Sequence, residues 1–317
     1  MPKKTNAPFL LSPTGKDYLW GGSRLKTEYN KRFDLSPLAE TWECSTHPDG
    51  PSCVSGGEYA GMTLAALLAA RPELLGTRHP DGELPILVKL IDAAAPLSVQ
   101  VHPDDAFAAE FENGSKGKTE MWVVLSAEPG ATLVYGFTRQ VTPDELRQRI
   151  RAGTLEEVLR FLPVKAGDVI LVEAGTVHAI GRGILVAEIQ ENSNLTYRLY
   201  DYNRRDKTGA LRPLHVEKAL RVARLGPAAL PETAGDDPGD LGGCEYFHVR
   251  RLSPENGEIT LPGREDSFAV LLCTGGCGRL KSAADVLSLE KGGCAFVPAG
   301  AGKLVLSGPG EFLEIVC

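Results

Sequence analysis

Four residues with metal-binding side chains lie in three strand-like segments of this chain. In Ser98-Val-Gln-Val-His102, residues two apart share a face of a strand, so Ser98, Gln100 and His102 are expected to point the same way. Glu120 opens the next strand-like run, and His178 follows a tight Ala-Gly turn. Two imidazoles, one carboxylate and one amide oxygen suit Zn²⁺ or another borderline divalent ion, with a position left for water or substrate.

Each of these signals also has an ordinary structural explanation. The polar row ending at His102 could face solvent on an edge strand, Glu120 could be a surface carboxylate, and His178 could be a hydrogen-bonded structural histidine. The chain contains no compact H-x-H or H-E-x-x-H motif. The metal site is therefore predicted from the combination, because a small barrel can bring three strands together.

A polar segment over 188–204 is dense in hydrogen-bonding side chains. Such density suits recognition of a polyol, in which each hydroxyl both donates and accepts. Within it, Arg198 and Arg204 are predicted to bind a phosphate through paired N–H donors. The alternative is a polar surface hairpin, which we prefer for the neighbouring Arg205 and Lys207.

The elements that must position these residues are mostly short strands. Strand-like runs occur at 86–91, 97–101, 121–125, 169–172 and 184–189. Helices are predicted at 63–75, at 143–162 as two short pieces separated at Gly153-Thr154, and at 214–225. Thr142 and Thr154 are suitable N-caps for the two pieces. Short strands separated by Gly and Pro turns favour a mainly β barrel or jelly roll with helical insertions.

A faint repeat and a linker suggest two domains. Residues 167–178 and 292–303 share a glycine, an apolar run and an Ala-Gly turn in the same register. The first copy ends in His178 and the second in Lys303, which is a poor metal ligand when protonated. The stretch 226–243 is rich in Gly, Pro and acidic residues. We therefore predict a catalytic domain at 1–225, a linker at 226–243, and a small β domain without a metal site at 244–317.

Bulk composition excludes several classes of function. The 317 residues carry a net charge of −7, whereas nucleic-acid binding needs a basic footprint. No apolar run approaches the roughly 20 residues that span a bilayer, and the start of the chain lacks a signal-peptide core. The seven cysteines are scattered, which is typical of reduced thiols in the cytoplasm. A cytoplasmic protein acting on a small molecule, without nucleic-acid or membrane partners, is expected.

These motifs, taken together, resemble a known enzyme family. The segments that carry the resemblance are Tyr18-Leu-Trp-Gly-Gly, Glu40-Thr-Trp-Glu, Leu97-Ser-Val-Gln-Val-His-Pro-Asp-Asp, Gly117-Lys-Thr-Glu-Met-Trp, Ala174-Gly-Thr-Val-His-Ala-Ile and 190–204. Together they resemble type I mannose-6-phosphate isomerases in their short bacterial form, over about 10–220. The resemblance implies a cupin (jelly-roll) fold and one zinc ion held by the four ligands named above. It also implies a catalytic Arg198, with Ser98 and Lys118 lining the substrate site.

The implied reaction interconverts mannose 6-phosphate and fructose 6-phosphate through an enediolate. A metal ion can polarise the substrate oxygens, and Arg198 can offset the developing negative charge. The base that removes the C2 proton has four candidates: Lys118, Glu188, Glu191 and a metal-bound hydroxide. The rival functions are an Fe²⁺-dependent cupin oxygenase, which would need no phosphate clamp, and a non-catalytic sugar-phosphate sensor, which would not need every metal-ligand type.

Overall fold

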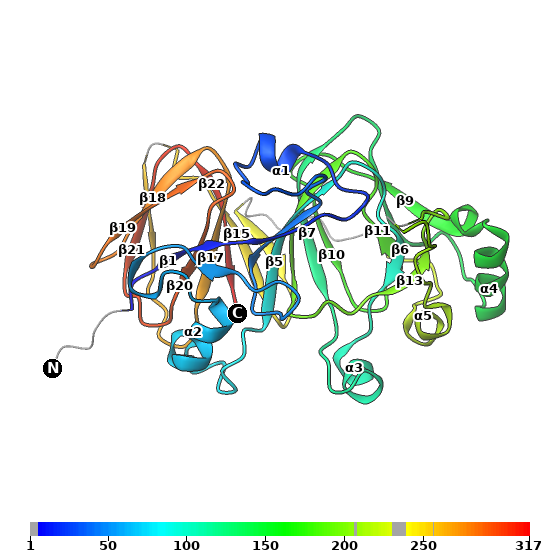
Figure 1. Ribbon diagram of the computed structural model, residues 1–317, viewed down its shortest axis with the longest axis horizontal. Helices are drawn as coiled ribbons and strands as arrows, with labels where there is room; N and C mark the ends of the chain where they lie inside the picture. The colour runs from blue at the N-terminus through cyan, green and yellow to red at the C-terminus, as the bar shows by residue number, and fades with distance from the viewer. Residues whose placement is uncertain (1–5, 206–207, 230–238, 256) are drawn as a thin grey trace.

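Two β barrels lie side by side in the computed structural model, which describes residues 6–205, 208–229, 239–255 and 257–317. Figure 1 shows the barrel built mostly from the N-terminal part of the chain on the right and the other barrel on the left. We call them the N-terminal barrel and the C-terminal barrel. Each consists of two facing antiparallel sheets, so the predicted mainly β jelly-roll class is confirmed.

The N-terminal barrel has a six-stranded and a five-stranded sheet. The larger sheet runs, in spatial order, through β10 (Val169–Val172), β7 (Glu120–Ala127), β12 (Ile184–Glu191), β5 (Ile86–Ala93), β3 (Glu40–Cys44) and β2 (Thr14–Lys16). The smaller sheet runs through β13 (Tyr197–Tyr200), β6 (Val99–Val101), β11 (His178–Ala179), β8 (Thr132–Phe137) and β9 (Leu159–Pro163). All five predicted strands are present, most of them a few residues longer or shorter than expected.

The C-terminal barrel has a seven-stranded and a four-stranded sheet. The larger sheet runs through β14 (Asp240–Gly243), β15 (His248–Leu252), β22 (Glu311–Val316), β17 (Ala269–Gly275), β20 (Cys294–Val297), β1 (Phe9–Ser12) and β4 (Cys53–Val54). The smaller sheet runs through β16 (Glu258–Leu261), β21 (Leu304–Ser307), β18 (Cys277–Lys281) and β19 (Val286–Glu290).

The two barrels repeat one topology. The order β10-β7-β12-β5-β3 in one large sheet corresponds to β20-β17-β22-β15-β14 in the other. The glycines at matching places of the predicted repeat, Gly167 with Gly292 and Gly175 with Gly300, all have positive φ. Positive φ is the conformation that favours glycine, so the same turns are specified twice. The repeat predicted from sequence is therefore confirmed.

Both ends of the chain build the C-terminal barrel. Strand β1 pairs with β20, and β4 pairs with β1, so residues near the N-terminus extend the C-terminal sheet. The last residues of the predicted linker form β14, while 230–238 lie outside the described residues. Cutting the chain at 226–243 therefore does not separate the two barrels, because strands from the N-terminal part pair with strands from the C-terminal part.

Short helices cover the edges of the barrels. They are α1 (Arg24–Thr27), α2 (Leu64–Ala70), α3 (Asp105–Phe111), α4 (Pro143–Ala152) and α5 (Val216–Val222), with 3₁₀ turns η1 (Gly57–Tyr59), η2 (Pro72–Leu75) and η3 (Leu155–Val158). Thr142 caps α4 as predicted, since its side chain accepts a hydrogen bond from the Glu145 amide. Thr154 makes no such bond, and the second predicted helix is a 3₁₀ turn that leads into β9. Across the described ranges, no helix is long and apolar enough to cross a membrane.

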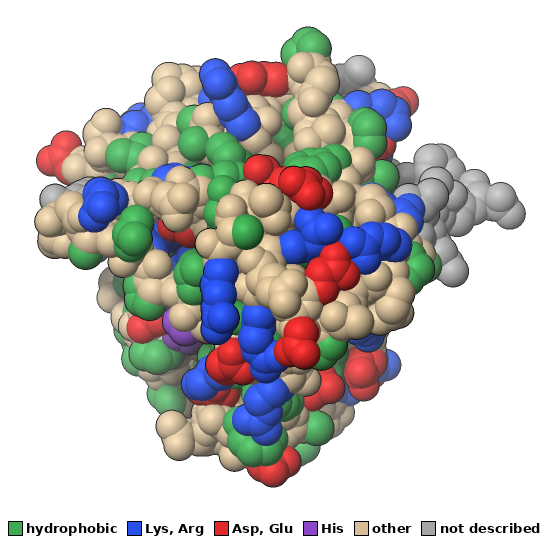
Figure 2. Space-filling view, turned by 90° about the vertical axis from the view of Figure 1, so that its right-hand side faces the viewer, with side chains coloured by type: hydrophobic (Ala, Val, Ile, Leu, Met, Phe, Trp, Pro, Cys, Tyr) green, Lys and Arg blue, Asp and Glu red, His purple; other side chains and the backbone are tan. Residues whose placement is uncertain are grey.

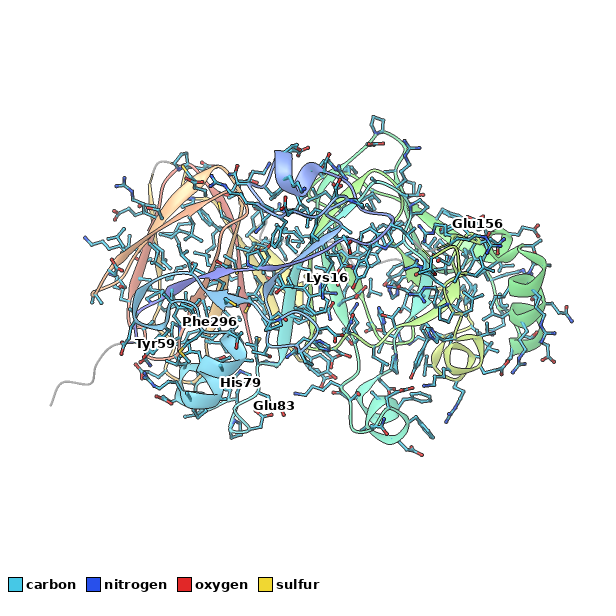
Figure 3. The ribbon with its side chains drawn as sticks, in the orientation of Figure 1. Lys16, Tyr59, His79, Glu83, Glu156 and Phe296 are labelled. Carbon is cyan, nitrogen blue, oxygen red and sulfur yellow. The ribbon has the colours of Figure 1, made fainter. Side chains whose placement is uncertain are left out.

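Apolar side chains fill four spaces: the interior of each barrel, the gap between the two large sheets, and the layer under α4 and α5. Phe296, labelled in Figure 3, stacks on Phe9 and Phe268 with ring centroids 5.3 and 5.2 Å away. Figure 2 shows mixed acidic and basic side chains on the face around α4 and α5, where Arg147 pairs with Glu217. The two barrels thus share a continuous apolar interface between their large sheets.

Candidate metal and substrate site

The predicted metal ligands meet inside the N-terminal barrel. On the smaller sheet, Gln100 is the cross-strand neighbour of His178 on one side and of Arg198 on the other. Glu120 begins β7 on the opposite sheet, and His102 follows directly after β6. Cross-strand neighbours share a face of a sheet, so these side chains converge from two facing sheets.

Three of these residues form a tight buried cluster. The ligand atoms of His102, Glu120 and His178 all lie within 4.8 Å of one another, and each residue is at most 1% exposed. Nε2 of His178 is 3.3 Å from Oε1 of Glu120, and Nε2 of His102 is 3.6 Å from Oε2. The amide Nε2 of Gln100 lies 3.4 Å from Nε2 of His178. Rotating the Gln100 amide group by half a turn exchanges its nitrogen and oxygen, which places the oxygen beside Nε2 of His178. Gln100 can therefore join the cluster as a ligand.

Hydrogen bonds hold both histidines in the tautomer that a metal ion requires. Nδ1 of His102 is 2.8 Å from the carbonyl oxygen of Leu195, and Nδ1 of His178 is 2.8 Å from that of Thr176. A carbonyl oxygen can only accept, so Nδ1 carries the proton in each ring. The Nε2 lone pairs therefore face Glu120, which is how a backbone partner orients a ligating imidazole.

The protonation states of the cluster also match metal binding. Burial, with a smaller contribution from Lys118, lowers the pKa of His102 to about 3, and burial lowers the pKa of His178. Burial opposes ionisation of Glu120, but Lys118 and His178 hold its pKa well below the usual range. Neutral imidazoles and an ionised carboxylate are the forms that bind metal ions.

Glu120 is a buried carboxylate whose only ion pair with a lysine or arginine, among the described residues, is with Lys118. Neither of its carboxylate oxygens accepts a well-aligned hydrogen bond from the described residues, although Nζ of Lys118 lies 2.5 Å from Oε2. A buried carboxylate without such bonds is costly unless a cation compensates it. The donor set, the tautomers and this carboxylate therefore fit a divalent ion.

A polar pocket of about 270 Å³ opens beside the cluster. Four residues predicted for the substrate site or the chemistry line it: Ser98, Lys118, Glu188 and Arg198. Nε of Arg198 donates to Oγ of Ser98 at 3.3 Å. Burial lowers the pKa of Arg198, and Arg212 adds to that shift. The pocket thus joins the metal-binding cluster to the guanidinium of Arg198.

Two predicted residues lie elsewhere. Glu191 is an odd number of residues from Glu188 on β12, so it points to the opposite face and does not line the pocket. Its Oε1 accepts from the Thr119 amide at 2.6 Å, and burial raises its pKa to about 7. Arg204 does not line the pocket either, because its guanidinium is bound to Asp201 and to the Pro96 carbonyl. Lys207 lies outside the described residues.

Three charged pocket residues were not anticipated as site residues: Glu40, Lys89 and Arg212. Lys89 Nζ donates to Oε1 of Glu188 at 2.9 Å, and Trp122 Nε1 donates to Oε2 at the same distance. Burial would lower the pKa of Lys89, but Glu188 and Glu40 outweigh burial and raise it. The sequence did carry one sign of this site residue: Lys89 is the single charged residue in the otherwise apolar run 86–91.

A wider groove of about 650 Å³ adjoins the pocket. Asn194 lines both, and its Nδ2 donates to Oδ2 of Asp49 at 3.0 Å. Glu83, labelled in Figure 3, also lines this groove. The groove is larger than the pocket but is lined by neither Gln100 nor Glu188, whereas the pocket is lined by both, so the chemistry is assigned to the smaller space.

Comparisons with known proteins agree with this geometry. Residues 9–146 match the model of the catalytic domain of type I phosphomannose isomerase. The chain is 36% identical over 313 residues to mannose-6-phosphate isomerase ManA of Bacillus subtilis, covering 97% of this chain and 98% of that protein. It is 43% identical over 222 residues to mannose-6-phosphate isomerase of Streptococcus mutans, covering 70% and 69%.

Solved structures share the whole architecture. The crystal structure of mannose 6-phosphate isomerase from Bacillus subtilis superposes with a TM-score of 0.89 at 33% identity, covering 98% of this chain and 99% of that one. A phosphomannose isomerase mutant from Salmonella typhimurium, 19% identical, has the same fold with a TM-score of 0.78, covering 98% and 99%. The fold is that of the cupins. The chain belongs to the type I mannose-6-phosphate isomerase family.

Proposed function

We propose that mannose 6-phosphate and fructose 6-phosphate interconvert in the pocket beside His102, Glu120 and His178. The observation that carries the proposal is the joining of this buried cluster to a polar pocket bearing Arg198, in a chain whose relatives are named mannose-6-phosphate isomerases. An oxygenase would have no use for the guanidinium, and a sensor would have no use for the cluster.

We further propose that the cluster holds one zinc ion per chain, with Gln100 as the fourth protein ligand. When bound, such an ion supplies Lewis-acid polarisation of the substrate oxygens. Support comes from the donor set of two imidazoles, a carboxylate and an amide oxygen. Within the described ranges, no other group of His, Cys, Asp or Glu has metal-binding spacing, and Lys303 stands where the repeat aligns it with His178.

The chain's own residues supply the proton chemistry. Aldose–ketose isomerisation needs a base to take the C2 proton and return it at C1. Glu188 lines the pocket and Glu191 does not, so we assign this role to Glu188. Although burial and Glu120 oppose ionisation, Lys118 and Lys89 lower the pKa of Glu188, which keeps it a carboxylate.

Two cations complete the arrangement. Nζ of Lys118 is 3.7 Å from Oε1 of Glu188, close enough to stabilise that carboxylate electrostatically. Among the described residues, the guanidinium of Arg198 forms no ion pair with a carboxylate and donates to Ser98 and to the Pro213 carbonyl. It can therefore offset negative charge that develops on the substrate.

An activity assay with mannose 6-phosphate tests this function. Fructose 6-phosphate should form, chelator should abolish its formation, and added Zn²⁺ should restore it. In D₂O, the product should carry deuterium at C1, in part if the closed site shields the proton from exchange. A fully metallated protein that forms no fructose 6-phosphate would refute the proposal. Consumption of O₂ would instead indicate an oxygenase, and binding without turnover a sensor.

We propose a cytoplasmic location. All seven cysteines are free thiols, three of them buried. Free thiols persist where the environment is reducing. Alkylation of freshly isolated protein, followed by mass measurement, should find seven reactive cysteines after unfolding without reductant, and disulfide-linked species would contradict the proposal.

A further inference from the structure

Three arginines lie near the carboxylate of Asp201: Arg204 and Arg212 bind it, and Arg198 lies within electrostatic range. Arg212 forms a two-point contact with Asp201, in which Nε donates to Oδ2 and Nη2 donates to Oδ1, each at 2.6 Å. Arg204 binds the same carboxylate from another side, with Nε 3.1 Å from Oδ1. Asp201 is only 4% exposed. Arg198 and Arg212 both line the pocket, and Arg204 does not.

The charges of the described residues at this place do not balance. Three guanidiniums and one carboxylate leave an excess of two positive charges among Arg198, Arg204, Arg212 and Asp201. Deeper in the pocket, each cation has its own anion, because Lys89 pairs with Glu188 and Lys118 with Glu120. A phosphate monoester carries a charge of roughly −1.5 to −2 near neutral pH. The excess therefore matches the charge of a phosphate group.

Arg212 has N–H donors that the contact with Asp201 does not use and that could bind a phosphate. A guanidinium has five N–H donors, and the contact with Asp201 uses two of them. The side chain of Arg212 is 17% exposed, so its remaining edge is reachable from the pocket. A fixed planar guanidinium with a free edge suits two-point binding of phosphate oxygens.

Arg204 has a different environment. Nη1 donates to the Pro96 carbonyl at 2.5 Å, Nη2 and Nε donate to Asp201, and the guanidinium lies over the Tyr202 ring. Its contacts are with the protein on several sides. It therefore braces Asp201 in place and does not face a ligand.

We propose that Arg212 binds the substrate phosphate together with Arg198, and that Asp201, braced by Arg204, is the positioning residue that aims Arg212. This inference rests on the proposed function, since it names the phosphate contact of that same pocket. It replaces the expectation that Arg204 makes this contact.

The test compares Arg212→Met with Arg205→Met in the metal-loaded protein. Arg205 is the matched control, because it is a neighbouring arginine that bonds the Gly209 carbonyl at the surface. Loss of one charge-assisted contact should raise KM for mannose 6-phosphate by roughly 10- to 100-fold and raise the inhibition constant of inorganic phosphate similarly. Metal content and, within a few-fold, kcat should stay at the parental level, and Arg205→Met should match the parent.

Asp201→Asn separates positioning from simple charge. This substitution adds net positive charge to the pocket, so charge alone predicts tighter phosphate binding. If Asp201 aims Arg212, KM should rise instead, with kcat changed less than KM. A KM that stays level or falls would overturn the positioning role, and it would do so even if Arg212→Met failed to fold.

Other outcomes overturn the assignment of Arg212 directly. They are a KM and an inhibition constant for Arg212→Met within about twofold of those of Arg205→Met, or a loss of kcat with KM unchanged. If the parent protein shows no isomerase activity, the proposed function fails, yet titration of both variants with inorganic phosphate, followed by ³¹P NMR, still decides whether Arg212 binds it.

Discussion

A buried ion pair between the two barrels offers a sharp test of the packing. Nζ of Lys31 lies 2.6 Å from Oε2 of Glu43 and 2.5 Å from the carbonyl oxygen of Gly292 in the C-terminal barrel. Oε1 of Glu43 accepts from the Thr41 hydroxyl at 2.6 Å. The side chains of Lys31 and Glu43 are 7% and 0% exposed. Lys31→Met should therefore leave an uncompensated carboxylate in the interior.

The size of the loss follows from how Glu43 can escape ionisation. Burial already raises its pKa, and Lys31 opposes that rise. Without Lys31, the folded protein must keep Glu43 protonated, which costs at most about 1.4 kcal/mol per pH unit above an unfolded pKa of roughly 4.3. That is about 3.7 kcal/mol near pH 7, consistent with the roughly 3–5 kcal/mol lost when one partner of a buried pair is removed.

The sign of the pH dependence is part of this prediction. A raised folded-state pKa means that the protonated form supports folding, so the variant should be hurt least at acidic pH. The deficit should shrink to about 1 kcal/mol or less near pH 5 and grow as pH rises, until Glu43 ionises inside the folded variant.

Urea unfolding of the metal-loaded protein, followed by circular dichroism at both pH values, measures the deficit. The matched control is Arg78→Met, which removes an exposed ion pair to Asp266 with side chains 59% and 47% exposed. That loss should be less than about 1 kcal/mol. Adding Glu43→Leu to Lys31→Met should recover most of the stability. A Lys31→Met deficit equal to the control's, or one independent of pH, would show that this reasoning is wrong.

Further predictions concern the site. His178→Ala should lower metal content, from about one ion per chain, together with activity, and elemental analysis that still finds one ion would contradict its role as a ligand. Arg198→Ala should keep the metal but reduce kcat/KM at least about tenfold, and a smaller loss argues against its role. Trp122→Phe removes the indole donor to Glu188 at 2.9 Å, so the free energy of unfolding should fall by about 1.5–3 kcal/mol in denaturant titrations, and no fall would mean that this bond contributes nothing.

Local sequence patterns were enough to predict which side chains cluster and where the turns around them lie. Alternation on a short strand put Gln100 and His102 on one face, and the structure places them together with His178. The glycines of the repeat predicted its turns correctly, because a positive φ favours glycine at those positions. The N-cap role of Thr142 could be predicted because the first amides of a helix lack backbone partners. A hydroxyl just before the helix can accept a hydrogen bond from one of them. These are local requirements, so local residues reveal them.

Which polar residues face the pocket depends on the packing of the two sheets of the N-terminal barrel. Strands β5 and β12 are buried on both faces, so their sequences carry no alternation that separates inside from outside. Glu188 and Lys89 point into the N-terminal barrel, whereas Glu191 points away, and that difference depends on which sheet packs on which side.

The roles of the arginines and the pairing of the N-terminal strand also depend on contacts between distant segments. Arg204 and Arg212 are alike in sequence, but one braces Asp201 while the other also reaches the pocket, a choice made by loop geometry. Strand β1 joins the C-terminal sheet through β20, nearly the whole chain away. Strand pairing and loop placement are decided by contacts between distant segments, whose apolar surfaces must be buried together, and no local pattern encodes that choice.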